Sequence, residues 1–441
     1  MPFLQEGKLS ITGSCIGLRS AGLRCFVALL ALFGLQSGNV FTQCSIAPST
    51  AVKATEWDGI FTQDGSGKGL EAEGAPGWTG GDSTYSLLLP NGDTAFFFSD
   101  SYIGEWPRTK GDGTVTRASN GLRTTELNCF TPICDPHASI FNARNSIVIL
   151  SRDRKQLRTL VGPKDNKGLS TSYFREPAAG LNYWVGDAIL LPAKGKEKQR
   201  ILVFLHKFDA KLAFHGAAVA QLNAETLAVE NLLEVKNLPD LVIHWGTAMV
   251  AENGFLYIYG KGARNGKKQI FVTRTNVKRP IDELADAAKW TAWNGTEWSG
   301  GPENAFPIIP AGDSISDEFN IARFNINGRP AYLLAAIDTT VPFGSWRDIT
   351  LYSSCSPEGP FTGKHVVYAM PESGSFTVPG LSAGNRLKEH LVVYNPHIHS
   401  QFSGLGRILI SYNINRSNNS DSIYIDGYRP RFFYVPIAGL K

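Results

Sequence analysis

Apolar and polar residues alternate along residues 78–104, which is the pattern of half-buried β-strands. The turn Pro90-Asn91-Gly92 divides this stretch into two strands, because Asn-Gly supplies the positive φ angles of a tight hairpin. Asp82 follows two glycines just before the first strand, and Asp100 follows the second strand. Both carboxylates are therefore expected at the open end of one hairpin. Taken alone, they are most simply explained as turn aspartates.

The same order of a polar opening, a strand, a turn and a stronger strand occurs five times. The openings are Gly80-Gly81-Asp82-Ser83, Val185-Gly186-Asp187, His244-Trp245-Gly246, Ser316-Asp317-Glu318 and Asn395-Pro396-His397-Ile398-His399. They start about 60 to about 105 residues apart, which is too irregular for a solenoid and is typical of propeller blades with insertions.

The repeats predict an all-β fold, a five-bladed β-propeller of four-stranded antiparallel blades in one domain from about residue 55 to 441. In such a ring the first strand of each blade lines the central channel. The ends of these strands meet at one mouth, so the five openings should form one ring of side chains. The best candidate for a helix is the segment Pro280 to Lys289, with proline at its first turn.

The N-terminus has the pattern of a targeting segment. Lys8, Arg19 and Arg24 precede an apolar run from Cys25 to Leu35, which has the length of a signal-peptide core and is short for a membrane span. We therefore expect residues 1–50 to be a signal peptide or signal anchor with a short linker, and the protein to be secreted, periplasmic or held at the cell surface. Whether the segment is cleaved stays open.

Composition and charge exclude some classes of binding partner. The formal net charge of +4 is small for 441 residues, and the sequence contains no cluster of basic residues that could bind phosphates. We therefore do not expect a nucleic-acid partner. No second hydrophobic span occurs, and we expect a monomer with no membrane contact beyond the N-terminal anchor. Cys129 and Cys134 can close a small loop disulfide, which leaves Cys44 and Cys355 over.

The ring brings together acids that suit glycosidic bond cleavage. We name Asp82, Asp187 and Glu318 as candidate catalytic residues. Carboxylates that share one pocket raise each other's pKa, which produces a general acid beside an ionised base or nucleophile. Cleavage of a glycosidic bond requires this pair. For each acid the simpler alternative is a solvated turn residue.

Other residues of the ring can contact a sugar through aromatic faces or hydrogen bonds. The candidates for substrate binding are Asp100, Tyr85, Asn145, Trp184, His244, Trp245, His397, His399 and Asn413. His397 and His399 alternate and should point the same way, and with His244 or a carboxylate they could hold a structural cation. A sugar-contacting or purely structural role for these histidines is the alternative. We expect no other metal and no cofactor.

Several motifs resemble those of a family of secreted five-bladed propellers known as domain of unknown function 4185. They are the hairpin of residues 80–104, the segments 145–148, 183–190, 244–250, 256–260 and 316–324, and the C-terminal segments 395–401, 407–415 and 428–435. Characterised relatives of that family are similar to endo-D-arabinanases, and more distantly to arabinanase and levansucrase propeller glycosidases. The resemblance implies that Asp82 is the base or nucleophile and that Asp187 orients or tunes the acid. The distant glycosidases carry the acid on the third blade, where this chain has His244-Trp245-Gly246, so Glu318 of the fourth blade or Asp187 takes that role in our hypothesis.

The sequence thus predicts an exported glycoside hydrolase acting on a complex polysaccharide or oligosaccharide, one that the resemblance suggests contains arabinofuranose. The alternatives are a non-catalytic, lectin-like propeller, favoured by the missing third-blade acid, and a scaffold without a sugar partner. The sugar, the linkage, endo or exo action and the stereochemical course stay open.

Overall fold

Every residue that the computed structural model describes lies in the second of two units of the chain, Met1–Phe41 and Thr42–Lys441. The described residues are 44–61, 77–104, 108–109, 115–116, 143–166, 170–175, 178, 180–193, 198–239, 242–342, 344–377, 388–416 and 428–441. Cys129 and Cys134 lie outside them. Within the described residues, no helix is both long and apolar enough to cross a membrane.

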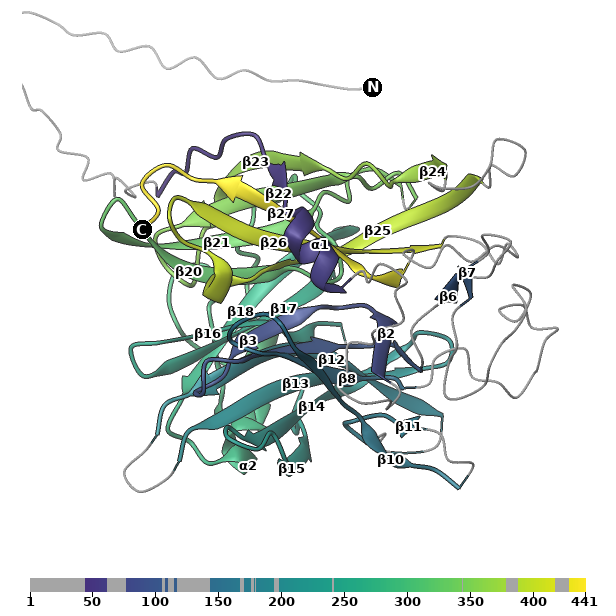
Figure 1. Ribbon diagram of the computed structural model, residues 1–441. Coiled ribbons are helices and arrows are strands. Elements are labelled where there is room, and N and C mark those ends of the chain that lie inside the picture. The colour runs from purple at the N-terminus through teal and green to yellow at the C-terminus, as the bar shows by residue number, and fades with distance from the viewer. Residues whose placement is uncertain are drawn as a thin grey trace, which may run out of the picture. The chain divides into compact units, whose positions relative to one another are not determined.

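The second unit is built from five antiparallel sheets that follow one another along the chain (Figure 1). Blade 1 comprises β3 (Tyr85–Leu88), β4 (Thr94–Phe98), β8 (Ser146–Leu150) and β9 (Leu157–Leu160). Blade 2 comprises β12 (Leu181–Leu191), β13 (Arg200–Asp209), β14 (Phe214–Asn223) and β15 (Val229–Glu234). Blade 3 comprises β16 (His244–Glu252), β17 (Phe255–Arg264), β18 (Lys267–Asn276) and β19 (Thr291–Ala292). Blade 4 comprises β20 (Asn320–Ile326), β21 (Arg329–Ile337), β22 (Asp348–Ser354) and β23 (Thr362–Ala369).

Blade 5 joins the two ends of the described chain. It comprises β25 (Lys388–Ile398), β26 (Arg407–Arg416), β27 (Pro430–Pro436) and, as its outer strand, β1 (Val52–Lys53), with β24 (Gly374–Thr377) on the other side of β25. In the pairing of β1 with β27, Val52 lies opposite Tyr434. Because a strand from before blade 1 completes the last blade, the ring is held closed by main-chain hydrogen bonds.

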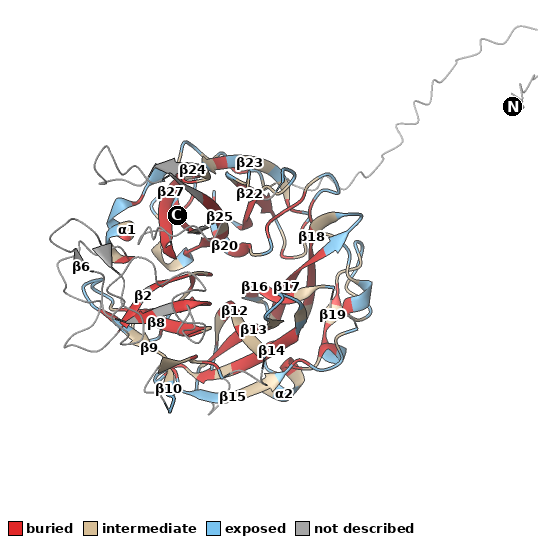
Figure 2. Ribbon diagram, turned by 90° about the vertical axis from the view of Figure 1, so that its right-hand side faces the viewer, coloured by how far each residue is buried: buried red, intermediate tan, exposed pale blue. Residues whose placement is uncertain are grey.

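The five blades form a ring with their inner strands around its middle, as Figure 2 shows. The inner strands β3, β12, β16, β20 and β25 contact one another in this order. The predicted five-bladed β-propeller is confirmed. The ring therefore gathers residues from all five repeats around one central region.

Each blade buries both faces against its neighbours, which explains the long apolar stretches of the inner and middle strands. Between blades 2 and 3, for example, Phe204, Trp245 and Trp290 share one apolar core. Between blades 5 and 1, the fully buried side chains of Trp57 and Phe61 from α1 (Thr55–Phe61) pack with Phe432. The packing of whole blade faces fixes the order and spacing of the inner strands.

Three of the inner strands are interrupted at corresponding positions by bulges. The pairing with the second strand shifts between Val185 and Ala188 in β12, between Trp245 and Ala248 in β16, and between Tyr394 and His397 in β25. A bulge re-aims the side chains beside it, which is why bulges are frequent next to active sites. Gly246 is required in its bulge, because its φ is 92° and a Cβ there would lie 2.1 Å from the ring of Phe204.

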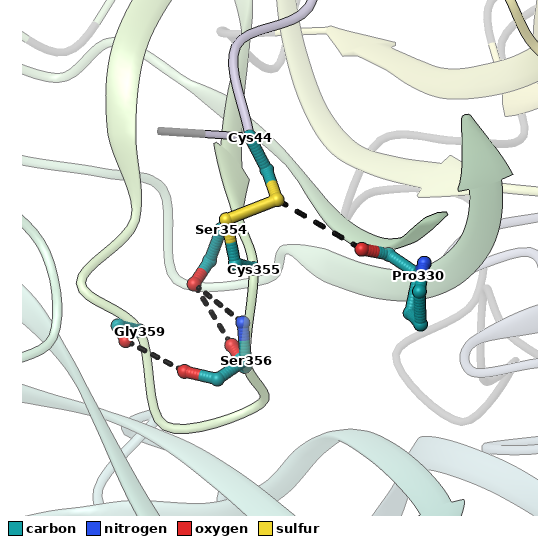
Figure 3. The surroundings of a disulfide bond; sticks show 6 residues. All are labelled: Cys44, Pro330, Ser354, Cys355, Ser356 and Gly359. Carbon is teal, nitrogen blue, oxygen red and sulfur yellow. Dashed lines mark hydrogen bonds between the residues drawn. A yellow bond between two sulfur atoms is a disulfide. The ribbon is translucent and has the colours of Figure 1, made fainter. Parts of the chain in front are cut away.

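The two cysteines left over by the sequence prediction form a disulfide with each other. Cys44 and Cys355 are bonded across 311 positions (Figure 3). Cys355 directly follows β22, so the bond ties the segment before β1 to blade 4. Ile46 is also 5% exposed and packs in the core of blades 4 and 5. The segment before β1 is thus part of the packed unit.

The remaining elements are short. They are the strand pairs β2 (Gly77–Gly81) with β5 (Ser101–Gly104), β6 (Arg108–Thr109) with β7 (Val115–Thr116) and β10 (Gly162–Lys164) with β11 (Ser170–Thr171), and the 3-10 helices η2 (Pro302–Asn304) and η3 (Ser400–Phe402). The helix predicted from Pro280 to Lys289 occurs in two pieces, α2 (Ile281–Leu284) and η1 (Ala287–Lys289). The histidine segment of blade 5 lies at the end of its inner strand and not before it, because β25 already begins at Lys388.

Candidate active site

The first blade presents Asp82 and Ser83 on a turn that the fifth blade holds in place. Ser83 and Thr84 have φ angles of 71° and 59°, which non-glycine residues keep only where the surroundings enforce them. From β26, Asn413 Nδ2 donates to the carbonyl oxygen of Gly81 over 3.3 Å and to Thr84 Oγ1 over 3.0 Å. A strained turn that carries a carboxylate is therefore fixed by a buried amide of the neighbouring blade.

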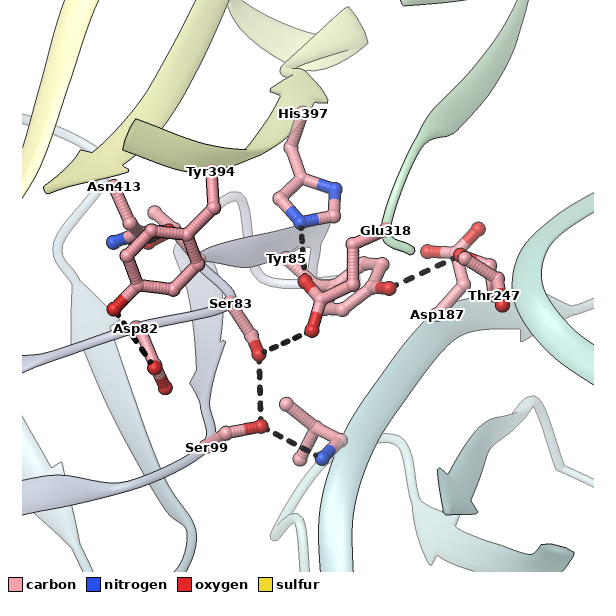
Figure 4. A network of polar contacts seen from close by, with 12 residues as sticks. Asp82, Ser83, Tyr85, Ser99, Asp187, Thr247, Glu318, Tyr394, His397 and Asn413 are labelled. Atoms are coloured by element: carbon pink, nitrogen blue, oxygen red, sulfur yellow. Dashed lines mark hydrogen bonds and ion pairs between the residues drawn. The ribbon is translucent and has the colours of Figure 1, made fainter. Parts of the chain in front are cut away.

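Glu318 contacts side chains of two other blades (Figure 4). Its Oε2 lies 3.2 Å from His397 Nε2, and its Oε1 lies 3.1 Å from Ser83 Oγ. His397 is 1% exposed, and its ring centroid is 3.9 Å from that of Tyr85. Burial raises the pKa of Glu318 to about 8, against the opposing effect of the hydrogen bond from Ser83. Glu318 is therefore a protonated carboxylic acid at neutral pH.

A chain of hydroxyl groups leads from Glu318 into the first blade. Ser83 Oγ lies 2.8 Å from Ser99 Oγ, which accepts a hydrogen bond from the main-chain N–H of Val185 over 3.0 Å. Each serine has one proton, so Ser83 donates either to Ser99 or to Glu318. If Ser83 donates to Ser99, it can accept the proton of a neutral Glu318. If Ser99 donates to Ser83, Ser83 can donate to an ionised Glu318. The chain thus accommodates both protonation states.

Asp82 is a second carboxyl group with a perturbed pKa. Its pKa is raised well above the usual range, first by burial and then by the charges of Asp100 and Glu318. Hydrogen bonds from Tyr428 and Tyr394 oppose the rise, and Tyr394 OH donates to Oδ2 over 3.1 Å. The other oxygen, Oδ1, is buried and accepts no hydrogen bond from the described residues. Asp82 therefore combines an electrostatic link to Glu318 with an oxygen that is available to a ligand.

Asp100 lies beside Asp82 and is compensated by a cation. Arg144 Nη1 lies 3.3 Å from Asp100 Oδ1, and the Trp184 side chain also donates to this carboxylate. Burial nevertheless raises the pKa of Asp100 to about 6. The predicted residues Asp100 and Trp184 thus contact each other, and they place an aromatic ring of blade 2 next to the two aspartates of blade 1.

Asp187 makes a different kind of contact. Its Oδ1 accepts from the main-chain N–H of Ala188 over 2.8 Å, and its Oδ2 accepts from the N–H of Met249 over 2.7 Å. Burial raises its pKa to about 7, and the two amide hydrogen bonds oppose this rise. With one oxygen bound to each of two inner strands, Asp187 links blade 2 to blade 3.

Three predicted residues support the site through buried hydrogen bonds. Tyr85 OH donates to the carbonyl oxygen of Thr247 over 3.1 Å. Asn145 Nδ2 donates to the carbonyl oxygen of Tyr183 over 3.1 Å, and the residue is fully buried. Like Asn413, these side chains lie below the surface of the site and orient its strands.

Three further predicted residues, His244, Trp245 and His399, differ in their exposure and in the residues they contact. Trp245 is 1% exposed in the core between blades 2 and 3, so of the neighbours His244 and Trp245 only the histidine keeps partial exposure. His399 is fully buried, and its Nδ1 lies 2.6 Å from Ser86 Oγ. His397 and His399 therefore contact different residues.

The described residues contain no group of three His, Cys, Asp or Glu side chains arranged to hold a metal ion. The cation suggested for the histidines stays a prediction. The described residues instead hold the carboxyl groups of Asp82 and Glu318 through neutral side chains, namely those of Tyr394, Ser83 and His397.

Sequence reasoning assigned no role to four residues of the site. Ser83 contacts Glu318, Tyr394 contacts Asp82 and Arg144 contacts Asp100. Ser99 contacts Ser83. A signal was present for two of them. Ser83 adjoins Asp82, and Tyr394 directly precedes the bulge that contains Asn395 and Pro396. Nothing in the sequence marked Ser99 or Arg144 as a contact of a specific acid.

Comparison with solved structures supports the fold. The chain is similar to a proposed hydrolase from Bacteroides ovatus, with a TM-score of 0.61 and 18% identity over 91% of this chain and 95% of that chain. Weaker similarity links it to an endo-arabinase from Bacteroides thetaiotaomicron, with a TM-score of 0.40 and 11% identity over 83% of this chain and 97% of that chain. An α-L-arabinofuranosidase from Podospora anserina in complex with cellotriose has a TM-score of 0.37 and 8% identity over 89% of this chain and 96% of that chain.

A search of curated proteins gave no significant match. The family model of a domain of unknown function, DUF5005, matches residues 73–436, which include the inner strands of all five blades. The match does not support the name expected from the motifs, domain of unknown function 4185. This chain belongs to the DUF5005 family.

Proposed function

We propose that this protein is an exported glycoside hydrolase that cleaves a complex polysaccharide, one that contains arabinofuranose, within the propeller mouth. The observation that carries the proposal is the placement of two carboxyl groups around Ser83: Asp82 directly precedes it in the chain, and Oε1 of Glu318 from blade 4 lies 3.1 Å from its Oγ. Glycosidases use such a pair, in which one group is neutral and the other ionised.

Glu318 is assigned as the general acid. Its pKa of about 8 keeps it protonated at neutral pH, and a proton can pass from it to the leaving oxygen of the glycosidic bond. His397 and the Ser83 hydroxyl hold its two oxygens from different blades. Because a hydroxyl and a neutral imidazole can each donate or accept, Ser83 Oγ and His397 Nε2 can contact Glu318 in both of its protonation states.

Asp82 is assigned as the base or nucleophile. Tyr394 donates to its Oδ2, which favours the ionised form, and Oδ1 remains to contact the sugar or a water molecule. The charge of Glu318 raises the pKa of Asp82, so retention of the Glu318 proton favours ionisation of Asp82. Ionisation of Asp82 with retention of the Glu318 proton gives the state that catalysis requires.

Asp187 is assigned a supporting role. Both of its oxygens already accept main-chain hydrogen bonds from Ala188 and Met249, so transfer of a proton from Asp187 would require one of these contacts to be replaced. Its two main-chain contacts and its position between blades 2 and 3 suit it to orient the inner strands.

The test is hydrolysis of a panel of polysaccharides that includes arabinan, with new reducing ends as the readout. The wild-type protein should release sugars from at least one member, and Asp82→Asn and Glu318→Gln should each lower kcat by at least about 100-fold. Glu225→Gln is the matched control, because Glu225 is exposed and pairs with Lys198 at a distant turn. Unchanged hydrolysis by either active-site variant would remove that residue from the mechanism.

The alternative is a carbohydrate-binding propeller without catalysis. The observation that favours it is the absence of an acid in the third-blade opening His244-Trp245-Gly246. Tight binding to a glycan array without new reducing ends from any substrate would support this alternative and exclude the hydrolase.

A further inference from the structure

Half-buried aromatic side chains form a continuous row from the candidate active site toward blade 3. The row starts at Trp184, which hydrogen-bonds to Asp100. Its ring centroid lies 4.6 Å from that of Phe208, Phe208 lies 5.5 Å from Phe214, and Phe214 stacks on His244 at 4.0 Å. All four rings keep partial exposure. They offer apolar ring surface beside the catalytic candidates, which suits the C–H faces of sugar rings.

The row ends at a pair of lysines that share one carboxylate. Lys261 Nζ lies 2.6 Å from Asp317 Oδ1, and Lys268 Nζ lies 2.5 Å from Asp317 Oδ2. Lys261 pairs with His244 across β16 and β17, and it is 9% exposed. Asp317 directly precedes Glu318 in the chain, and its charge raises the pKa of Glu318, so the lysine pair is close to the candidate acid.

The local charge at the end of this row is positive. Two ammonium groups face one carboxylate, and the nearby His206 and His244 are neutral, since burial and the charge of Lys261 lower their pKa values to about 4 and about 3. Each ammonium has three N–H donors and gives one to Asp317, so donors remain for a second acceptor. The Asp317 side chain is 52% exposed and that of Lys268 is 33% exposed, which leaves the pair within reach of a ligand.

We propose that blades 2 to 4 form a subsite for an anionic sugar residue, in which the aromatic row contacts the sugar rings and Lys261 and Lys268 bind a carboxylate of a uronic acid. The inference rests on the proposed function, because it assigns the substrate of the same mouth. It adds that the polysaccharide carries acidic residues next to the cleaved bond. Among the described residues, Asp317 is the one ion-pair partner of the desolvated Lys261, and a uronate would satisfy remaining donors of both lysines, which a neutral sugar would not.

The test is calorimetric binding with the Glu318→Gln protein, so that turnover does not enter the result. The probes are oligogalacturonates, glucuronoxylan oligomers and alginate oligomers, each paired with its carboxyl-reduced counterpart. At least one acidic oligomer should bind about tenfold more tightly than its neutral counterpart, and added salt should reduce this difference. Lys268→Met should abolish the preference, and Lys268→Arg should restore most of it.

The control is Lys198→Met, because Lys198 is exposed on blade 2 and pairs with Glu225. It should leave the preference unchanged. Unfolding temperatures of all variants separate loss of binding from loss of fold. If every acidic oligomer binds no better than its neutral counterpart, or if Lys268→Met keeps the preference, the acidic subsite is excluded. A preference for acidic oligomers without hydrolysis by the wild type would instead refute the proposed catalysis and keep the subsite.

Discussion

Tyr394 donates a hydrogen bond to Asp82 over 3.1 Å, although the two residues are 312 positions apart in the chain. The contact joins blade 5 to blade 1. At the outer edge of blade 5, β1 pairs with β27 and thereby also links the N-terminal part of the unit to its last blade. The environment of the candidate base therefore depends on closure of the ring. The same holds for Glu318, which contacts His397 of blade 5 and Ser83 of blade 1.

Replacement of Tyr394 by phenylalanine should weaken the base. The hydrogen bond from Tyr394 opposes the rise in the pKa of Asp82, so its loss raises that pKa further and moves the acidic limb of the pH–rate profile to higher pH. A hydrogen bond to a charged group contributes about 1.5–3 kcal/mol, so kcat/KM should fall by about 10- to 100-fold.

The measurement is kcat/KM against pH for Tyr394→Phe. Tyr173→Phe is the control, because Tyr173 OH donates to the carbonyl oxygen of Leu227 and no carboxylate is involved. An acidic limb that stays in place in Tyr394→Phe would show that Tyr394 does not act on Asp82.

Removal of the Ser83 hydroxyl should shift the opposite limb. A general acid must be protonated, so activity should fall as the pH rises through the pKa of Glu318, about 8. The hydrogen bond from Ser83 lowers that pKa. Ser83→Ala should therefore raise it and move the alkaline limb to higher pH, with the acidic limb changed less.

Alanine is a suitable replacement because it tolerates the φ of 71° at position 83 about as poorly as serine does, so the backbone cost is similar. Ser151→Ala, in the exposed turn after β8, is the control. A shift of the alkaline limb to lower pH would contradict the assignment of Glu318 as the acid.

Asp187→Asn distinguishes a supporting residue from the acid. Asparagine has one acceptor oxygen, so its amide nitrogen would face either the N–H of Ala188 or that of Met249. A buried donor without an acceptor costs about 1–3 kcal/mol. We expect a lower unfolding temperature and reduced activity with an alkaline limb that is still set by Glu318. Loss of that limb in Asp187→Asn, together with full activity of Glu318→Gln, would assign the acid to Asp187 instead.

Loss of the disulfide should destabilise the ring closure. Cys44 and Cys355 are bonded across 311 positions, and disulfides typically stabilise by about 2–5 kcal/mol by restricting the unfolded chain. Cys44→Ser and Cys355→Ser should therefore lower the unfolding temperature by similar amounts, and the double variant should fall no further. Reductant should lower the unfolding temperature of the wild type more than that of the variants. Strongly additive effects of the two substitutions would contradict the bond.

Much of the fold was readable from local patterns. The hairpin of residues 78–104 and the four later repeats predict strands, turns and a count of five blades, because alternation and turn residues act within a few positions. The same patterns place Asp82, Asp187 and Glu318 in the polar openings, just before the strands that were predicted to line the channel.

Contacts within the site were less predictable where bulges change the register. Strand alternation just before the bulge in β16 leaves His244 partly exposed and buries Trp245, whereas the sequence pattern assigned both residues to the ring. Asp187 lies within the bulge of β12, and there it reaches the N–H of Met249 in the next blade. A bulge of one or two extra residues in a strand is decided by packing against the neighbouring blade, which the strand's own sequence does not specify.

The sequence alone determined the number of blades, the strands and the acidic openings, because these follow from the order of apolar, polar and turn residues along short stretches. Only the tertiary structure decided that Cys44 joins Cys355, that Tyr394 reaches Asp82 and that Glu318 lies between Ser83 and His397. These pairs form when the ring closes and blade faces pack, and their partners are separated by 235, 312 and 79 positions for the side-chain hydrogen bonds alone. At such separations, geometry comes from the packing of whole blades and leaves no local signal in the chain.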